Sequence, residues 1–515
     1  MTRIESDSNQ AVGPTFTRRG FLAAAGASAS AFTIVPGRAL GFDGGVAANS
    51  RINIAFIGVG SQGLRVMFEF LAHPDVQAVA VADPVRSAAN YHQWGRNEFR
   101  DHVRKLVGAD SGWEWLSPNA PMLRLTPSLS VPAGVAGREP AQKIVDGFNG
   151  RHRKSGEGRG CTAYADFREL LTKEKGIDAV VVGTTDVLHA PASVAAMKAG
   201  KHVFCQKPMA HSIHAARLMA DVANESKVAT QVAVTLQASE GTRRLCEWIS
   251  AGVVGPIERV FNWSNRPSWP QALDRPQAVQ PVPDGLDWDL WLGPAPFRGY
   301  NDAYLPFVWR GWRDFGCGAI GDMGCYSFDS IYRALKLTPP VAAEAMVSDR
   351  HAETYPASST IHLEFPARGD LPPVKVSWYD GGRKPEKPAE IDDDRPLPSE
   401  GLIFQGDRGV LLCDFNGGKM QLFPQSRRDA FTEPPKRLPR SPGNDREWLD
   451  AVRDGKADTG ANFEFTSKVT EALHLGNMAG RTGEKLTWDS ATMTVGGSTS
   501  AQALVRPEAR KGWEV

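Results

Sequence analysis

The sequence is poor in cysteine, with six in 515 residues, and it contains no C-x-x-C pair. This spacing argues against the common cysteine-ligated metal sites and against a dense disulfide framework, so we expect no metal. Most of the six lie in apolar or glycine-rich runs, which favours free thiols, with a chance disulfide as the alternative. They are Cys161, Cys205, Cys246, Cys317, Cys325 and Cys413.

The sequence also lacks a strong charge imbalance, because its formal net charge is +1. Composition therefore gives no case for nucleic acid or an anionic membrane as a partner. No stretch is long and apolar enough for a transmembrane helix, and no internal repeat is visible. The length allows two or three domains with large cores.

The first 48 residues do not look like part of the fold. Thr17–Leu22 holds an Arg-Arg pair followed by Phe-Leu, and the apolar run Ala23–Val35 is too short to span a bilayer. The pattern resembles a twin-arginine export signal, cleaved between Ala39 and Ala48, and predicts a periplasmic or otherwise exported protein. An unstructured N-terminus with a chance Arg-Arg pair is the alternative.

A glycine-rich turn between two apolar strands predicts a dinucleotide-binding fold. We expect a buried strand at Ile52–Ile57, a helix at Gln62–Ala72 and a second strand at Ala78–Ala82. The turn between the first two would bring backbone amides and a helix N-terminus to a pyrophosphate. Its residues are Gly58, Gly60, Ser61, Gln62 and Gly63. A tight turn without a ligand is the alternative.

An acidic residue follows the second strand at the spacing this fold requires. Asp83 lies 20 residues after Gly63. A carboxylate there bonds the ribose hydroxyls and repels a 2′-phosphate, which favours NAD over NADP. A turn residue before Pro84 is the alternative.

The alternation of predicted strands and helices along the chain indicates an α/β protein of two domains. We assign residues 49–208 to a Rossmann dinucleotide-binding domain, with an insertion at about 91–160 where the pattern breaks down. Strands dominate from 209 to 490, which predicts a C-terminal α+β domain with an open, mainly antiparallel sheet. Residues 491–515 are expected to form a C-terminal tail.

Lys207 stands before a proline at the end of an apolar strand, on the sheet edge where the dinucleotide is expected. Its ammonium can bond a substrate hydroxyl and stabilise an alkoxide as hydride leaves. Gln206 precedes it, and Thr184 and His189 follow a neighbouring strand, so these three are further candidates on the cofactor side. The alternatives are a surface lysine at a proline kink and an ordinary helix cap.

A glycine-rich segment downstream carries an acid and a phenol four residues apart. If this segment is helical, Asp322 and Tyr326 share a face. Beside a lysine they form an acid–base set, and the ammonium should lower the pKa of the tyrosine. The alternative is a packed helix start with Tyr326 in the core.

Tryptophan is concentrated just before this segment. Six of the fourteen tryptophans fall between Trp263 and Trp312. Aromatic faces suit the apolar faces of sugar rings, although packing explains most of these residues. Trp309, Arg310 and Arg313 are the best candidates for substrate contacts.

From about Arg51 to about Asp489 the chain resembles the Gfo/Idh/MocA oxidoreductases, through the glycine turn, Lys207-Pro208 and the Asp322–Tyr326 segment. The resemblance implies a Rossmann domain, a C-terminal α/β domain and oligomer contacts through its sheet, here a homodimer or homotetramer. Two positions depart from the family. Gln206 stands where glutamate is usual, and Tyr326 stands where many members have histidine.

The resemblance implies an NAD-dependent oxidoreductase acting on a sugar or sugar derivative, with Lys207 and Tyr326 handling the hydroxyl proton and Asp322 orienting the substrate. Since export by the twin-arginine route carries folded proteins away from cytoplasmic NAD, we expect a tightly retained cofactor. Two alternatives remain open. One is redox-neutral glycoside cleavage through a transient ketone, and the other is a non-catalytic exported protein that binds sugar or nucleotide.

Overall fold

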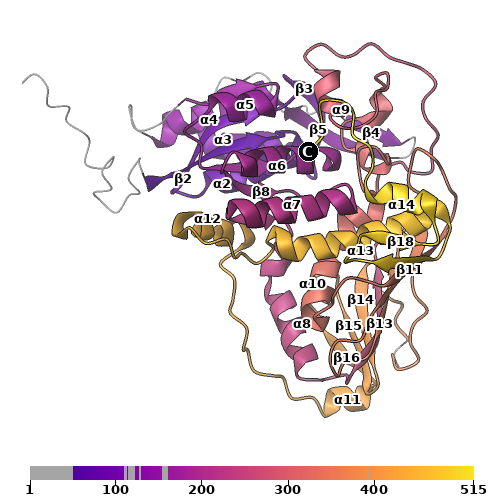
Figure 1. Ribbon diagram of the computed structural model, residues 1–515. Coiled ribbons are helices and arrows are strands. Elements are labelled where there is room, and N and C mark those ends of the chain that lie inside the picture. The colour runs from indigo at the N-terminus through magenta and orange to yellow at the C-terminus, as the bar shows by residue number, and fades with distance from the viewer. Residues whose placement is uncertain (1–49, 109–112, 114–121, 127–128, 154–159, 392–393) are drawn as a thin grey trace, which may run out of the picture. The chain divides into compact units, whose positions relative to one another are not determined.

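A parallel sheet with helices on both faces forms the first part of the fold (Figure 1). The computed structural model describes residues 50–515, except 109–112, 114–121, 127–128, 154–159 and 392–393, and the predicted export signal lies outside them. The strand order is β6-β2-β1-β7-β8-β9. The strands are β1 (Ile52–Ile57), β2 (Val76–Ala82), β6 (Thr162–Tyr164), β7 (Ala179–Val182), β8 (His202–Cys205) and β9 (Thr230–Val232). The helices are α2 (Ser61–Leu71), α4 (Arg138–His152), α5 (Phe167–Lys173), α6 (Asp186–Lys198) and α7 (Ile213–Ser226).

The central strands are buried on both faces, as their continuous apolar runs predict. β1 pairs in parallel with β2 on one side and β7 on the other, so the carboxyl ends of three strands meet at one edge. β8 continues the edge beside β7. This edge is where an open α/β sheet binds its ligands.

The predicted insertion begins and ends differently from our expectation. A small antiparallel sheet of order β3-β5-β4 and helix α3 (Glu98–Val107) lie between β2 and α4. These strands are β3 (Ala88–His92), β4 (Met122–Thr126) and β5 (Leu129–Ala136). Helix α4, which we placed inside the insertion, packs on β2 and is the crossover to β6. The parallel sheet also runs on to β9, beyond the expected domain boundary at 208.

A nine-stranded sheet forms the second part, with order β16-β15-β14-β10-β13-β12-β11-β17-β18. β10 pairs with β13 in parallel and the other pairs are antiparallel, which confirms a mainly antiparallel sheet. Its strands are β10 (Ile257–Trp263), β11 (Ala342–Val347), β12 (Ser359–Phe365), β13 (Val374–Tyr379), β14 (Gly401–Gly406), β15 (Gly409–Cys413), β16 (Gln421–Phe423), β17 (Leu486–Asp489) and β18 (Thr494–Gly496).

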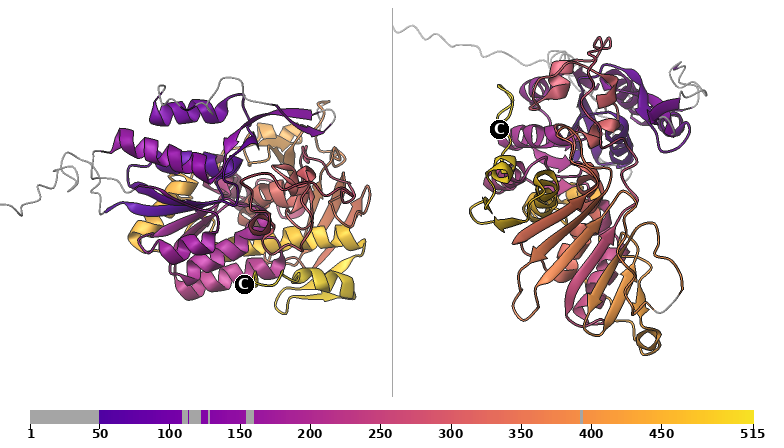
Figure 2. Two further views of the ribbon diagram at one scale, coloured as in Figure 1. Left: turned by 90° about the horizontal axis from the view of Figure 1, so that it is seen from above. Right: turned by 90° about the vertical axis from the view of Figure 1, so that its right-hand side faces the viewer.

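The helices that follow β9 are α8 (Glu240–Ser250), α9 (Trp288–Leu292), α10 (Cys325–Leu335), α11 (Gln425–Asp429), α12 (Asn444–Asp454), α13 (Phe463–Thr482) and α14 (Thr499–Val505). Among them, α12 packs on β1 and β9 of the parallel sheet. The right-hand view of Figure 2 shows helices lying on one side of the large sheet, most of whose strands are orange. Helix α13 lies along α7, which joins it to the parallel-sheet part (Figure 1).

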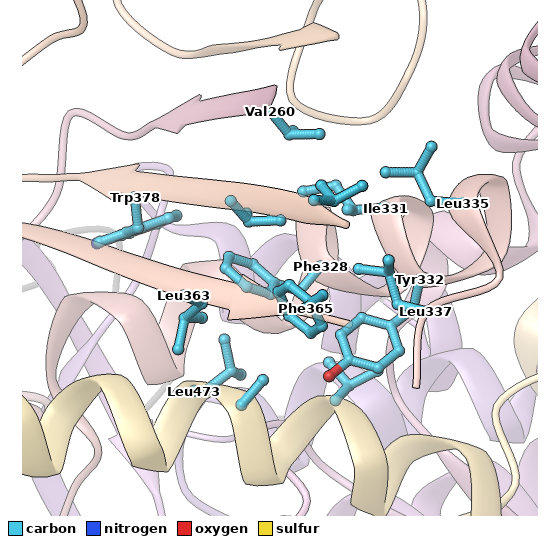
Figure 3. Close-up of a cluster of buried hydrophobic side chains, with 14 of the residues drawn as sticks. Val260, Phe328, Ile331, Tyr332, Leu335, Leu337, Leu363, Phe365, Trp378 and Leu473 are labelled. Carbon is cyan, nitrogen blue, oxygen red and sulfur yellow. The ribbon is translucent and has the colours of Figure 1, made fainter. Parts of the chain in front are cut away.

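The main core of the large sheet forms against α10 and α13. Along α10, Phe328, Ile331, Tyr332 and Leu335 recur at helical spacing, so one face of the helix is apolar. This face meets Leu363, Phe365 and Trp378 of the sheet and Leu473 of α13 (Figure 3). The packing fixes the start of α10, which carries Tyr326.

The opposite face of the sheet is partly covered by the chain itself. Ile391, from the connection between β13 and β14, packs with Trp263, Ile403 and Phe423 on that face. Oligomerisation through this sheet stays a prediction.

Residues 491–515, expected to be a tail, carry β18 and α14 and end with Trp513 packed against Phe167. All six cysteines are free. Among the described helices, none is long and apolar enough to cross a membrane.

Candidate active site

A cleft of about 560 Å³ opens at the carboxyl edge of the parallel sheet. The glycine turn after β1, Asp83 after β2, Thr184 after β7 and Lys207 after β8 all line it. The facing wall comes from the segment that precedes and begins α10, including Asp322 and Tyr326. The cleft therefore unites the predicted cofactor and substrate residues.

The glycine turn is packed backbone against backbone. A Cβ on Gly58 would lie 2.6 Å from the Gly183 carbonyl carbon and from the Thr184 nitrogen, and φ at Gly58 is +83°. A Cβ on Gly63 would lie only 2.0 Å from the carbonyl oxygen of Gly58. Gly63 itself does not line the cleft, so its role is to let α2 approach β1 closely.

The N-terminus of α2 is free to receive an anion. Helix α2 begins at Ser61 after Gly60, which provides no side-chain cap, and its first turn holds no acidic residue. The first amides of such a helix lack intrahelical partners and favour negative charge. Gly60, Ser61 and Gln62 all line the cleft, so this end of α2 fits a pyrophosphate.

Asp83 is held in place by two backbone bonds. Its Oδ2 accepts from the Val59 amide and its Oδ1 from the Val85 amide, each at 2.8 Å. Burial raises the pKa of Asp83 to about 6, although these bonds and Arg138 oppose the rise. Each carboxylate oxygen retains a lone pair for a further donor, which fits ribose hydroxyls. Asp83 therefore also fits the alternative interpretation, in which it stabilises the turn before Pro84.

His189 does not line the cleft, in contrast to our prediction. It is buried in α6, and its Nδ1 donates to the carbonyl oxygen of Pro208 at 2.7 Å. Burial lowers its pKa to about 4, so the ring is neutral. It therefore supports the Lys207-Pro208 elbow from behind, whereas Thr184 and Gln206 do line the cleft.

Lys207 and Asp322 form an ion pair across the cleft wall. The Lys207 Nζ donates to Asp322 Oδ1 at 2.6 Å and to the Asp322 carbonyl oxygen at 3.1 Å. Arg310 Nε donates to the same Oδ1 at 3.3 Å. Burial raises the pKa of Asp322, but the two cations outweigh it and leave that pKa below its ordinary value. Despite burial, Asp322 raises the pKa of Lys207 above its ordinary value, so the ammonium stays charged.

Tyr326 keeps its proton at neutral pH. The Lys207 Nζ lies 5.2 Å from the centre of its ring. Burial raises the pKa of Tyr326 to about 12, and the ammonium of Lys207 is the main effect opposing that rise. Our expectation of a lowered pKa was wrong, because the desolvation of the phenolate costs more than one nearby cation restores.

Two of the three predicted substrate residues reach the cleft. Trp309 and Arg310 line it, and the Arg310 guanidinium lies 4.4 Å from the centre of the Trp309 ring. Arg313 does not. It is buried on the other side of the 3₁₀ turn Val308–Gly311, donates to the His351 carbonyl and stacks on Tyr355.

Two groups of cleft residues were missed by the sequence analysis. The small sheet extends Tyr91, His92 and Trp94 into the cleft, and His92 stacks on Phe307 with ring centres 4.4 Å apart. The sequence feature that could have identified these three residues is their clustering as aromatic residues within a polar insertion. The second group is a single residue, Asp186, which is a buried carboxylate at the start of α6. The described residues contain no cluster of side chains that could hold a metal ion.

Two family models match the chain. The oxidoreductase family model for an NAD-binding Rossmann fold matches residues 135–234, and the model for that family's C-terminal alpha/beta domain matches 253–367. Residues 135–234 and 253–367 thus belong to the two domains of the Gfo/Idh/MocA oxidoreductase family. The resemblance found in the sequence is therefore confirmed.

Curated relatives of this family match parts of the chain. A 1,5-anhydro-D-fructose reductase of Ensifer adhaerens is 36% identical over 129 residues, covering 24% of this chain and 38% of the reductase. A levoglucosan dehydrogenase of Pseudarthrobacter phenanthrenivorans is 27% identical over 237 residues, covering 45% of this chain and 47% of the dehydrogenase. The chain thus spans less than half the length of either relative.

A solved structure supports the fold across most of the chain. The WlbA dehydrogenase of Bordetella pertussis, in complex with NADH and UDP-GlcNAcA, superposes with a TM-score of 0.50 at 13% identity. The alignment covers 85% of this chain and 99% of that chain. At this identity the likeness shows a shared fold alone.

Proposed function

We propose that this family member is an NAD-dependent oxidoreductase that interconverts a CH–OH group and a carbonyl on a sugar or sugar derivative. The observation that carries the proposal is the Lys207–Asp322 ion pair beside Tyr326, in the same cleft as the glycine turn and Asp83. The charged ammonium of Lys207 and the neutral phenol of Tyr326 are both hydrogen-bond donors, and such donors stabilise a developing alkoxide.

The cofactor half of the cleft fits a dinucleotide. Gly60, Ser61 and the open N-terminus of α2 would hold the pyrophosphate, and Asp83 would bond the adenosine ribose. Thr184 and Gln206 would line the nicotinamide end. NAD supplies the capacity to accept or return hydride.

The chain's own residues position and polarise the substrate. Lys207 would donate to the reacting oxygen and stabilise its negative charge. Tyr326, protonated up to a pKa of about 12, would donate to the same oxygen. Asp322 keeps the ammonium of Lys207 charged and aimed, and Trp309 offers an aromatic face for the sugar ring.

Cofactor retention is part of the proposal, and it is motivated by the predicted export signal. We expect native mass spectrometry of the purified protein to detect NAD(H) bound without any addition. Levoglucosan, D-glucose and 1,5-anhydro-D-fructose serve as a sugar panel, chosen partly from the named relatives. The panel is incubated in pairs, so that one sugar donates hydride and the other accepts it, and products are analysed by chromatography.

Each outcome separates one part of this proposal from another. Turnover without added nucleotide supports a retained cofactor. Turnover only with fresh NAD contradicts retention and leaves the oxidoreductase assignment standing. Binding of sugars with no turnover under either condition contradicts the enzymatic assignment.

Cofactor choice is expected to depend on the charge of Asp83. Asp83→Asn keeps the size of the side chain and an acceptor for one backbone amide, but removes the negative charge that repels a 2′-phosphate. We expect the ratio of NADPH to NADH affinity to rise by about 10-fold or more, measured by fluorescence titration. Asp178→Asn is the matched control, since Asp178 bonds Asn53 at the other end of β1. An unchanged ratio in Asp83→Asn would show that Asp83 does not face the ribose.

A further inference from the structure

Oxidation of a hydroxyl group releases a proton, and the predicted acid–base residues are poorly suited to take it. Lys207 is held as an ammonium by Asp322, and burial keeps Tyr326 as a phenol. Asp322 Oδ1 already accepts from both Lys207 and Arg310, so its charge is committed to two cations. The site therefore needs another proton acceptor.

Asp186 is a carboxylate placed in the cleft wall that neither the sequence analysis nor the proposed function uses. It is the first residue of α6, directly after the turn that follows β7, and it lines the cleft together with Lys207 and Tyr326. Its side chain is nearly enclosed, with the residue only 3% exposed. Such enclosure separates it from bulk water while leaving it at the cleft.

The Asp186 carboxylate is oriented by Cys317. Oδ2 accepts from the Cys317 backbone amide at 3.0 Å, and Cys317 belongs to the glycine-rich segment that also carries Asp322. The Cys317 thiol also hydrogen-bonds to this carboxylate. These bonds orient the carboxylate, and its two oxygens together still have lone pairs able to accept a proton.

The charged groups around Asp186 have opposing effects on its pKa. The cations Lys207 and Arg310 favour its charged form, whereas Asp322 disfavours it. The remaining ionisable neighbours are all neutral groups, namely Cys205, Cys317, Cys325 and Tyr355. Burial is the largest effect and raises the pKa of Asp186 to about 7. The carboxylate can therefore take up and release a proton near neutral pH.

We propose that Asp186 is the catalytic base of the oxidation, accepting the hydroxyl proton of the substrate, and the acid of the reverse reaction. The inference rests on the proposed function. The substrate O–H bond breaks and its proton passes to Asp186. The C–H electron pair leaves as hydride for the oxidised nicotinamide, the C=O bond forms, and the sugar is oxidised as the cofactor is reduced.

The kinetic test uses Asp186→Asn, which retains an acceptor for the Cys317 amide. With levoglucosan and D-glucose as donors, and with 1,5-anhydro-D-fructose or added NAD as oxidant, we expect kcat/KM to fall by about 10²–10⁴-fold. The kcat/KM of the wild type should fall as the pH drops below about 7, because Asp186 becomes protonated. This fall, the acidic limb of the pH profile, should be absent in Asp186→Asn. Asp380→Asn is the matched control, because Asp380 is another buried carboxylate, with a pKa raised by burial to about 6, that lies outside the cleft.

A second readout needs no substrate. Burial raises the pKa of Asp186 from 3.8 to about 7, so its contribution to stability is complete below pH 4 and is lost as the pH rises to 7. Asp186→Asn removes this loss. The melting temperature of the variant relative to the wild type should therefore rise between pH 4 and pH 7, by about 2–5 °C, and stay level above. Calorimetry of the cofactor-free proteins measures it.

The outcomes distinguish this inference from the proposed function. If the wild type oxidises neither donor, with 1,5-anhydro-D-fructose or with added NAD as oxidant, the proposed function fails and the assignment of Asp186 fails with it. If the wild type is active and Asp186→Asn keeps both its rate and its acidic limb, only the assignment is overturned. A pH-independent difference in melting temperature also overturns it.

Discussion

Replacing Lys207 by methionine is expected to lower kcat/KM on the sugar panel by about 10³-fold, while NADH affinity stays within a few-fold of the wild type. Methionine keeps most of the side-chain volume but removes the only ammonium that the structure places beside Tyr326 in the described cleft. Asp322 retains Arg310 as a partner, so the loss of Lys207 does not leave a buried charge unpaired. Steady-state kinetics and fluorescence titration with NADH separate the two effects.

Lys201→Met is the matched control for this prediction. Lys201 lies just before β8, which ends at Cys205, two residues ahead of Lys207, and its Nζ donates to the Ile177 carbonyl at 2.8 Å, away from the cleft. We expect its kinetics to match the wild type. If Lys207→Met keeps the wild-type kcat/KM, Lys207 takes no part in the reaction. If its NADH affinity falls as much as its kcat/KM, the role of Lys207 is to bind the cofactor.

The cofactor half of the site was predictable because its signals are local. A buried strand, a glycine turn, a helix and an acid at fixed spacing determine backbone geometry within about thirty residues. The structure places Gly58, Gly60 and Asp83 as this pattern predicts. That Lys207 and Asp322, which are 115 residues apart, share one site was also predicted, because the family resemblance adds the long-range information that periodicity lacks. Their ion pair was not predicted, since Asp322 was expected to orient the substrate.

Side-chain direction was the main source of error. Arg310 and Arg313 looked equivalent in the sequence, yet a 3₁₀ turn sends one to Asp322 and the other to His351. His189 sits one residue after Leu188, which lines the cleft, and points the other way. Spacing alone does not resolve such differences in an irregular segment.

Burial was the second source of error. The pKa of Tyr326 was expected to fall beside an ammonium, but the sequence does not show how completely the cleft removes water. For the same reason the sequence did not single out Asp186, a carboxylate whose pKa burial raises to about 7. Electrostatic roles depend on tertiary packing, which residue type does not reveal.

Substituting alanine for Gly63 is expected to weaken NADH binding by about 100-fold or more and to lower the melting temperature. The new Cβ would lie 2.0 Å from the Gly58 carbonyl oxygen and 2.8 Å from its carbon. Both are backbone atoms of the turn, so no side chain can move aside, and the contact can be relieved only if α2 shifts away from β1. That shift moves the helix N-terminus which would hold the pyrophosphate. Calorimetry and fluorescence titration of NADH measure the two consequences.

Gly150→Ala is the control that isolates this close approach from the general effect of adding a methyl group. Gly150 lies near the end of α4 and is exposed, and a Cβ there would meet no atom within 4 Å beyond its own helix. Alanine should leave NADH affinity unchanged and stabilise the helix slightly, by up to about 1 kcal/mol. If Gly63→Ala instead binds NADH as tightly as this control, α2 does not need its close contact with Gly58. The cofactor site would then depend on Asp83 and the α2 amides without a fixed distance between helix and strand.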